Sequence, residues 1–110
     1  MNNKVDLNEL QVLTETWHKD RKITINGTSL AQLCKLSEEQ GELASAINRG
    51  CKDKEAIKDA IGDCIVVLSA IANLNGMHIS DCWKHAYNII KDRKGMLTKE
   101  GVFIKEEDLK

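Results

Sequence analysis

Two acidic segments in apolar surroundings decide how this chain is expected to fold. Residues 33–43 read LCKLSEEQGEL, and residues 59–67 read DAIGDCIVV. Apolar positions recur around both segments at helical spacing, about 100° per residue, which predicts helices over about 29–49 and 54–74. Each of these helices would carry a cluster of carboxylates. The cluster on the first helix falls opposite its apolar stripe, and the cluster on the second borders a buried face.

The acidic side chains of these segments are candidates for one shared metal site. Glu38, Glu39 and Glu42 point into one sector of the first helix, while Asp59 and Asp63 lie one turn apart on the second. Converging carboxylates repel one another unless cations lie between them. Oxygen-only ligand sets suit hard cations, above all Mg²⁺, with Mn²⁺ as the alternative. A solvated helix face, or a salt bridge from Asp63 to a lysine, would explain the same acids without a metal.

The remaining sequence predicts an all-α four-helix bundle in a single domain, residues 1–110. A helix over about 7–19 would present the apolar stripe Leu10, Leu13 and Trp17, and another would run from about 80 to Gly95. Ser29 with Gln32 is a candidate capping box for the helix over 29–49. Residues 96–110 form a tail in which residues 102–104 are a short strand or an extended arm.

The helix over 54–74 indicates a second copy of the chain. Residues 64–72 read CIVVLSAIA, without a charge on any side, and a helix that is apolar all round is covered all round. A monomer of 110 residues can hardly cover a helix completely. We therefore expect the bundle to be completed by homo-oligomerisation.

The composition limits which kinds of binding partner and which cellular compartment we expect for this protein. The chain has a formal net charge of −1, without the basic excess typical of nucleic-acid-binding proteins. No apolar run reaches the ~18 residues of a membrane span. Its four cysteines form no CxxC pair and show no metal-ligand spacing with the histidines, which favours a reduced protein. We expect a cytoplasmic protein that binds neither nucleic acid nor a membrane.

The order of three motifs resembles that of a known family. Glu-Glu-x-x-Glu at 38–42, Gly-Asp at 62–63 before an apolar run, and Asn-x-x-Lys at 88–91 are similar to the MazG-like all-α nucleoside triphosphate pyrophosphohydrolases. The resemblance implies Mg²⁺-dependent cleavage of the α–β phosphoanhydride bond of a (deoxy)nucleoside triphosphate, giving the monophosphate and pyrophosphate. It also implies a dimer or tetramer in which helices of two subunits form the site.

The same resemblance implies roles for individual residues. The implied metal ligands are Glu39, Glu42 and Asp63, with Glu38 and Asp59 as further candidates for metal binding or for orienting the attacking water. The implied phosphate contacts are Asn88 and Lys91. On chemical grounds Lys91, together with Arg93, is also a candidate to bind the substrate and stabilise charge on the departing pyrophosphate. Trp17 is either a base-stacking residue or part of the core.

One position departs from the family pattern. The family's Glu-x-x-Asp requires glutamate at position 60, where this chain has Ala60. Asp59 is adjacent but rotated by ~100° around the helix. This leaves the number of metals open. It also leaves an alternative function: a catalytically weak or inactive helical oligomer that binds nucleotide or a protein partner in a regulatory role.

Overall fold

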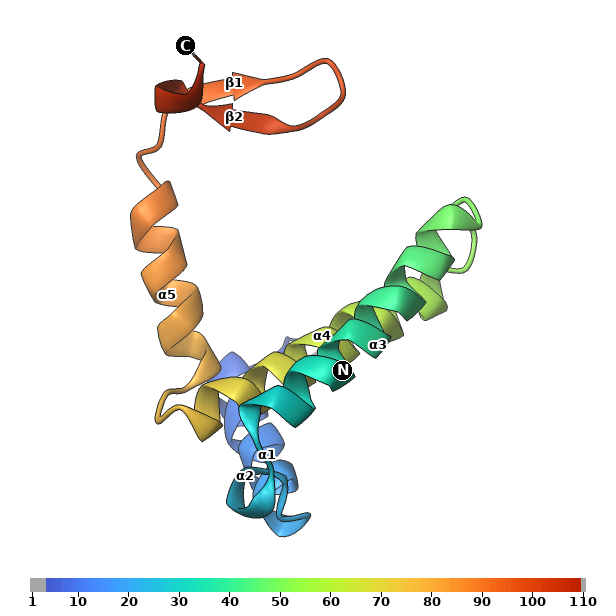
Figure 1. Ribbon diagram of the computed structural model, residues 1–110, viewed down its shortest axis with the longest axis vertical. Helices are drawn as coiled ribbons and strands as arrows, with labels where there is room; N and C mark the ends of the chain where they lie inside the picture. The colour runs from blue at the N-terminus through green and yellow to red at the C-terminus, as the bar shows by residue number, and fades with distance from the viewer. Residues whose placement is uncertain (1–3, 110) are drawn as a thin grey trace. The chain divides into compact units, whose positions relative to one another are not determined.

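A computed structural model describes residues 4–109 and is mostly helical, which confirms the predicted all-α class. Its elements, in chain order, are α1 (Leu7–Asp20), α2 (Ile23–Asn26), α3 (Ser29–Asn48), α4 (Lys54–Leu74), α5 (Ile79–Ile90), β1 (Gly95–Leu97), β2 (Phe103–Lys105) and the 3₁₀ helix η1 (Glu106–Asp108) (Figure 1). The chain divides into two compact units, residues 1–80 and 81–110, and each is described by itself. A single domain therefore stays a prediction.

Side-chain caps set the starts of the three long helices of the first unit. The Asp6 carboxylate accepts hydrogen bonds from the backbone N–H groups of the first turn of α1, as its position before that helix predicts. Thr28 caps α3 by accepting from the Ala31 N–H, so the cap lies one residue before the predicted Ser29. Asp53 caps α4 in the same way, accepting from the Ala56 N–H.

The helical hairpin of α3 and α4 is the centre of the first unit (Figure 1). The two helices run antiparallel, joined through residues 49–53, where Gly50 has a φ of +90° that favours glycine. The buried apolar side chains are mostly small: Ala46, Ala60, Val67, Ala70 and Ala72. Small side chains let the helix backbones approach closely, which brings side chains at the edges of this seam near one another.

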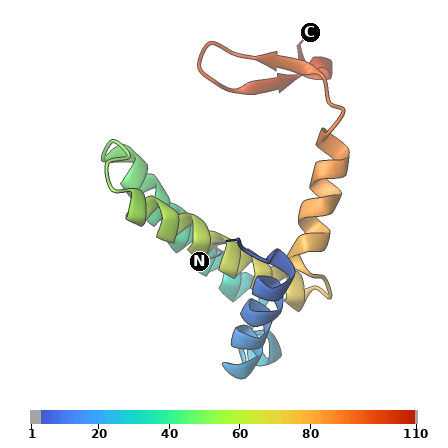
Figure 2. The same ribbon diagram turned by 180° about the vertical axis from the view of Figure 1, so that it is seen from behind.

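Helix α1 packs against α4 through its polar face, and not through the predicted apolar stripe (Figure 2). Its least exposed side chains are Gln11, Thr14, Glu15 and His18. Leu10, Leu13 and Trp17 are 45–59% exposed, so this apolar stripe is not covered within the single chain. The reason is that Gln11, Glu15 and His18 find polar partners on and beyond α4.

One face of α4 is also uncovered in the single chain. Ile61, Ile65 and Leu68 recur at helical spacing and are 40–52% exposed. The sequence predicts that this helix is covered on every side, and α3 and α1 cover only part of it. Among the described residues no single helix is both long and apolar enough to span a bilayer, although α4 and α5 pass that test as a bent pair.

The second unit consists of most of α5 followed by a β-hairpin. α5 ends at Ile90, five residues before the predicted Gly95. β1 and β2 are antiparallel, with Met96 opposite Ile104, so the tail is a hairpin and not an extended arm. Gly95 is needed here because an added Cβ would collide with the Ile104 carbonyl oxygen.

Candidate metal centre

Three carboxylates predicted from the sequence come together between α3 and α4. Glu39 and Glu42 lie about one turn apart on α3, and Asp63 faces them from α4. Their nearest oxygens all lie within 4.8 Å of one another. The antiparallel packing of the α3–α4 hairpin is therefore what converts two distant sequence motifs into one acidic group.

Glu39 is the member of this group that most needs a partner. It is only 6% exposed, and its Oε2 atom has no hydrogen-bond partner among the described residues. Its other oxygen, Oε1, lies 3.5 Å from the Lys35 ammonium. A buried carboxylate oxygen without a partner is unfavourable, by about 1–3 kcal/mol or more for a charged group. A cation beside Glu39 would remove this cost.

The charge of the group also acts on Asp63. Desolvation, followed by the charge and hydrogen bonding of Glu39 and the charge of Asp59, raises the pKa of Asp63 above its usual value. Each of these effects disfavours an additional negative charge. Three oxygen donors that repel one another are the chemistry that a hard divalent cation fits. Glu39, Glu42 and Asp63 are thus a suitable set for Mg²⁺ or Mn²⁺.

The other two predicted acidic ligands lie outside this group. Glu38 pairs with Lys35 at 3.2 Å and its side chain is 66% exposed. The same pairing raises the pKa of Lys35, chiefly through the hydrogen bond to Glu38. Asp59 is exposed, and its charge reaches Asp63, but its oxygens are not among those within 4.8 Å of each other. Ala60 lies about one turn before Asp63 on α4 and is buried, at 3% exposure.

The predicted phosphate contacts belong to the second unit. Asn88 lies on α5, while Lys91 and Arg93 follow the end of that helix, and all three are exposed. The backbone of Lys91 continues the last helical turn, because its N–H donates to the Tyr87 carbonyl at 2.9 Å. Asn88 and Lys91 are therefore one turn apart, as predicted, and their contact with substrate stays a prediction.

Trp17 is not a core residue of this chain. Its indole is 45% exposed, with the Arg21 guanidinium 4.2 Å from the ring centroid. Its neighbour His18 makes an edge contact with the ring at 5.5 Å. Burial is the largest cause of the lowered pKa of His18, and it acts by disfavouring the charged form of the imidazole. Base stacking by Trp17 stays a prediction.

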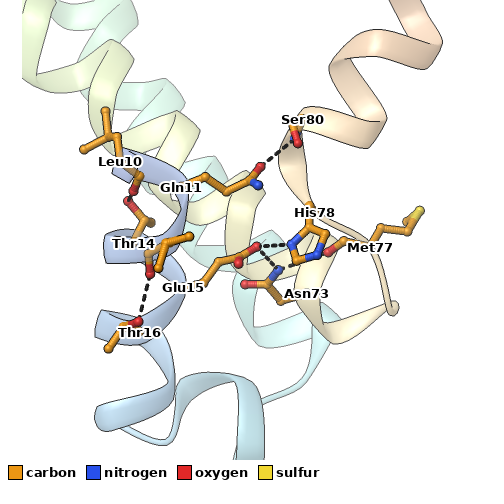
Figure 3. Close-up of polar contacts among 10 residues, drawn as sticks. Leu10, Gln11, Thr14, Glu15, Thr16, Asn73, Met77, His78 and Ser80 are labelled. Atoms are coloured by element: carbon orange, nitrogen blue, oxygen red, sulfur yellow. Dashed lines mark hydrogen bonds and ion pairs between the residues drawn. The ribbon is translucent and has the colours of Figure 1, made fainter. Parts of the chain in front are cut away.

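A polar cluster that the sequence did not predict ties α1 to the end of α4 (Figure 3). The Glu15 carboxylate accepts from the Asn73 amide at 2.8 Å and lies 2.6 Å from Nδ1 of His78. Gln11 accepts from the Ser80 backbone N–H at 2.9 Å. The partners are 58 to 69 residues apart in sequence, so no local pattern signals them.

Comparison with known proteins identifies the family of this chain. Residues 28–97 match the model of the MazG nucleotide pyrophosphohydrolase domain, and this segment contains all three carboxylates and the Asn88–Lys91 pair. The chain belongs to this family. Its members act on nucleotides and usually depend on divalent metal.

A protein of Haemophilus phage HP1 is similar over part of the chain. It is described as an uncharacterized 18.2 kDa protein in the rep-hol intergenic region. The two are 41% identical over 70 residues, which is 64% of this chain and 42% of the phage protein. The chain thus matches less than half the length of that relative. No solved structure matches.

Proposed function

We propose that this protein is a Mg²⁺-dependent nucleoside triphosphate pyrophosphohydrolase, which cleaves the bond between the α and β phosphates of a (deoxy)nucleoside triphosphate. The observation that carries the proposal is the carboxylate group of Glu39, Glu42 and Asp63 in a chain of the MazG family. The buried, unpartnered oxygen of Glu39 supports a cation at that place.

The triphosphate is negatively charged, so a site made of carboxylates can bind it only with cations between them. A bound Mg²⁺ or Mn²⁺ would neutralise phosphate charge and activate water for attack on the α phosphorus. Glu38 and Asp59 lie beside the group without belonging to it, so either can accept the proton of the attacking water. Lys91 and Arg93 would stabilise charge on the departing pyrophosphate, and Asn88 would donate to a phosphate oxygen. Trp17 would stack on the base.

The uncovered apolar faces support a homo-oligomer. Leu10 and Leu13 on α1, and Ile61 and Ile65 on α4, lie exposed on the single chain. Exposed apolar stripes at helical spacing mark interaction surfaces. A dimer or tetramer would bury them and complete the bundle. We place this assembly in the cytoplasm, with neither nucleic acid nor a membrane as partner.

Ala60 favours a second candidate function. Because Ala60 is buried and offers no ligand atom, the site has one carboxylate fewer than the family pattern. The alternative is a catalytically weak or inactive oligomer that binds nucleotide or a protein partner in a regulatory role.

Release of pyrophosphate separates these two candidates. The purified protein is assayed with each ribo- and deoxynucleoside triphosphate, in Mg²⁺ and in excess chelator. The enzyme is expected to release pyrophosphate and monophosphate in equal amounts, only with Mg²⁺. Folded, metal-binding protein that releases none from any triphosphate would contradict the enzymatic proposal and favour the binding protein.

A further inference from the structure

The number of cations that the carboxylate group can hold depends on what lies at each end of it. Helices α3 and α4 are antiparallel (Figure 1). One turn forward on α3, from Glu39 to Glu42, therefore corresponds to one turn back on α4, from Asp63 to Ala60. Three of these four positions provide carboxylate oxygens within 4.8 Å of one another. The fourth position is Ala60, which is 3% exposed and whose methyl side chain offers no ligand atom.

The opposite end of the group already holds a positive charge. Lys35 lies one turn before Glu39 on α3, and its ammonium is 3.5 Å from Oε1 of Glu39 and 3.2 Å from Oε2 of Glu38. This ammonium engages two carboxylates that would otherwise be free to bind a second metal. It also repels any cation placed at that end.

Asp59 does not replace the missing ligand. It is exposed on α4 and rotated by about 100° from Ala60, and it acts on Asp63 through its charge. Among the described residues, Glu39, Glu42 and Asp63 are the one group of three or more such side chains whose oxygens are close enough to share an ion, and Asp59 is not part of it. The unpartnered, buried Oε2 of Glu39 gives this group one well-defined acceptor.

Three convergent carboxylates suit a single octahedral ion that keeps several waters. A pair of ions about 3.5–4 Å apart needs bridging carboxylates and further ligands for each metal. We infer that this chain holds one resident divalent cation per site, and that Ala60 sets this number. The inference rests on the proposed metal-dependent function and concerns the same site.

Counting bound Mn²⁺ tests this inference without reference to activity. Metal-free protein is titrated with Mn²⁺, and the free ion is followed by electron paramagnetic resonance. One Mn²⁺ per chain is expected, without the spectrum of a spin-coupled pair. Asp59→Asn should keep this count, with Kd changed by less than the ~10-fold that loss of a supporting group costs. Two ions per chain, a coupled spectrum, or loss of binding in Asp59→Asn would overturn the inference.

Restoring a carboxylate at position 60 tests the role of Ala60 itself. Ala60→Glu is expected to raise the count to two per chain, with a coupled spectrum. Folded Ala60→Glu protein that still binds one ion would show that position 60 does not set the number. If circular dichroism shows that this variant is unfolded, the wild-type count and the Asp59→Asn titration still decide how many ions the natural site holds.

A pyrophosphate assay on the same samples separates this inference from the proposed function. Two ions per chain together with pyrophosphate release would overturn the single-ion inference and leave the function standing. One ion per chain without pyrophosphate release from any triphosphate would support the inference and contradict the function.

Discussion

Replacing Asp63 with asparagine should stabilise the metal-free protein and destabilise the metal-bound one relative to wild type. Asp63 has an oxygen within 4.8 Å of Glu39 and Glu42. Two unit charges at 4.8 Å repel by about 3.5 kcal/mol at an effective dielectric constant of 20, and by about 0.9 kcal/mol in bulk water. Because Asp63 is exposed, we expect Asp63→Asn to raise the free energy of unfolding of the metal-free protein by an amount toward the lower end of this range, about 1–2 kcal/mol.

The sign of this difference should reverse when metal is added. A cation at 100 times its Kd stabilises the folded protein by about 2.7 kcal/mol, and the variant would lose most of this gain because it lacks one ligand. Thermal unfolding of both proteins is followed by circular dichroism, in chelator and in excess Mg²⁺, at equal protein concentration. Since 1 kcal/mol corresponds to about 4–8 °C in a domain of 60–100 residues, both differences are measurable.

Glu55→Gln provides the matched control for this experiment. Glu55 is an exposed acid on the same helix, paired only weakly with Lys58 at 3.9 Å. Its replacement should change the free energy of unfolding by less than about 0.5 kcal/mol and should not alter the effect of Mg²⁺. The electrostatic reasoning would be refuted by an Asp63→Asn variant that is less stable than wild type in chelator. It would also be refuted by a variant that Mg²⁺ stabilises as much as it stabilises the wild type.

Four further predictions follow from the same structure. Glu39→Gln should abolish metal binding, measured by titration calorimetry, and pyrophosphate release, while the far-ultraviolet circular dichroism stays unchanged; an unfolded variant would indicate a structural role instead. Lys91→Ala should raise KM or lower kcat without changing metal affinity, and unchanged kinetics would remove this lysine from the site. Ile65→Asp should reduce the mass seen by analytical ultracentrifugation to that of the 12.3 kDa chain, whereas an unchanged mass would exclude this face of α4 from the interface. Burial lowers the pKa of His18, so the free energy of unfolding of the wild type should fall by at most about 1.4 kcal/mol per pH unit as the pH drops below 6.5. His18→Gln should reduce this pH dependence in thermal melts. Equal pH dependence in the two proteins would show that His18 is not its source.

The limits of the long helices could be read from the sequence because they depend on local signals. The predicted 54–74 coincides with α4, and Asp53 and Gly76 are polar or turn-forming residues at its two ends. The end of α5 was placed five residues too late, because the charged residues after Ile90 do not interrupt a helical pattern. Of the hairpin of β1 and β2, only the second strand was considered from the sequence, because short strands carry little periodicity.

The candidate site was predictable for a related reason. Glu39, Glu42 and Asp63 lie on two consecutive helices, so helical spacing and antiparallel packing suffice to bring them together. Their separation from Asp59 was not predictable, because it depends on which face of α4 meets α3. Which face of α1 meets α4 was not predictable, because amphipathic patterning predicts that an apolar face will be covered without saying by which chain.

The polar seam between α1 and α4 determines how the first helix is held. An apolar helix can slide along its neighbour by one turn at little energetic cost, because hydrophobic contacts are not directional. Glu15 and Gln11 have specific partners in Asn73 and the Ser80 N–H. A shift of one turn would break both hydrogen bonds, and it would leave the part-buried Glu15–Asn73 pair unpaired at a cost of about 1–3 kcal/mol. These directional hydrogen bonds thus fix the position of α1 along α4. They also fix its rotation about its own axis, and therefore the direction in which Leu13 and Trp17 point outward.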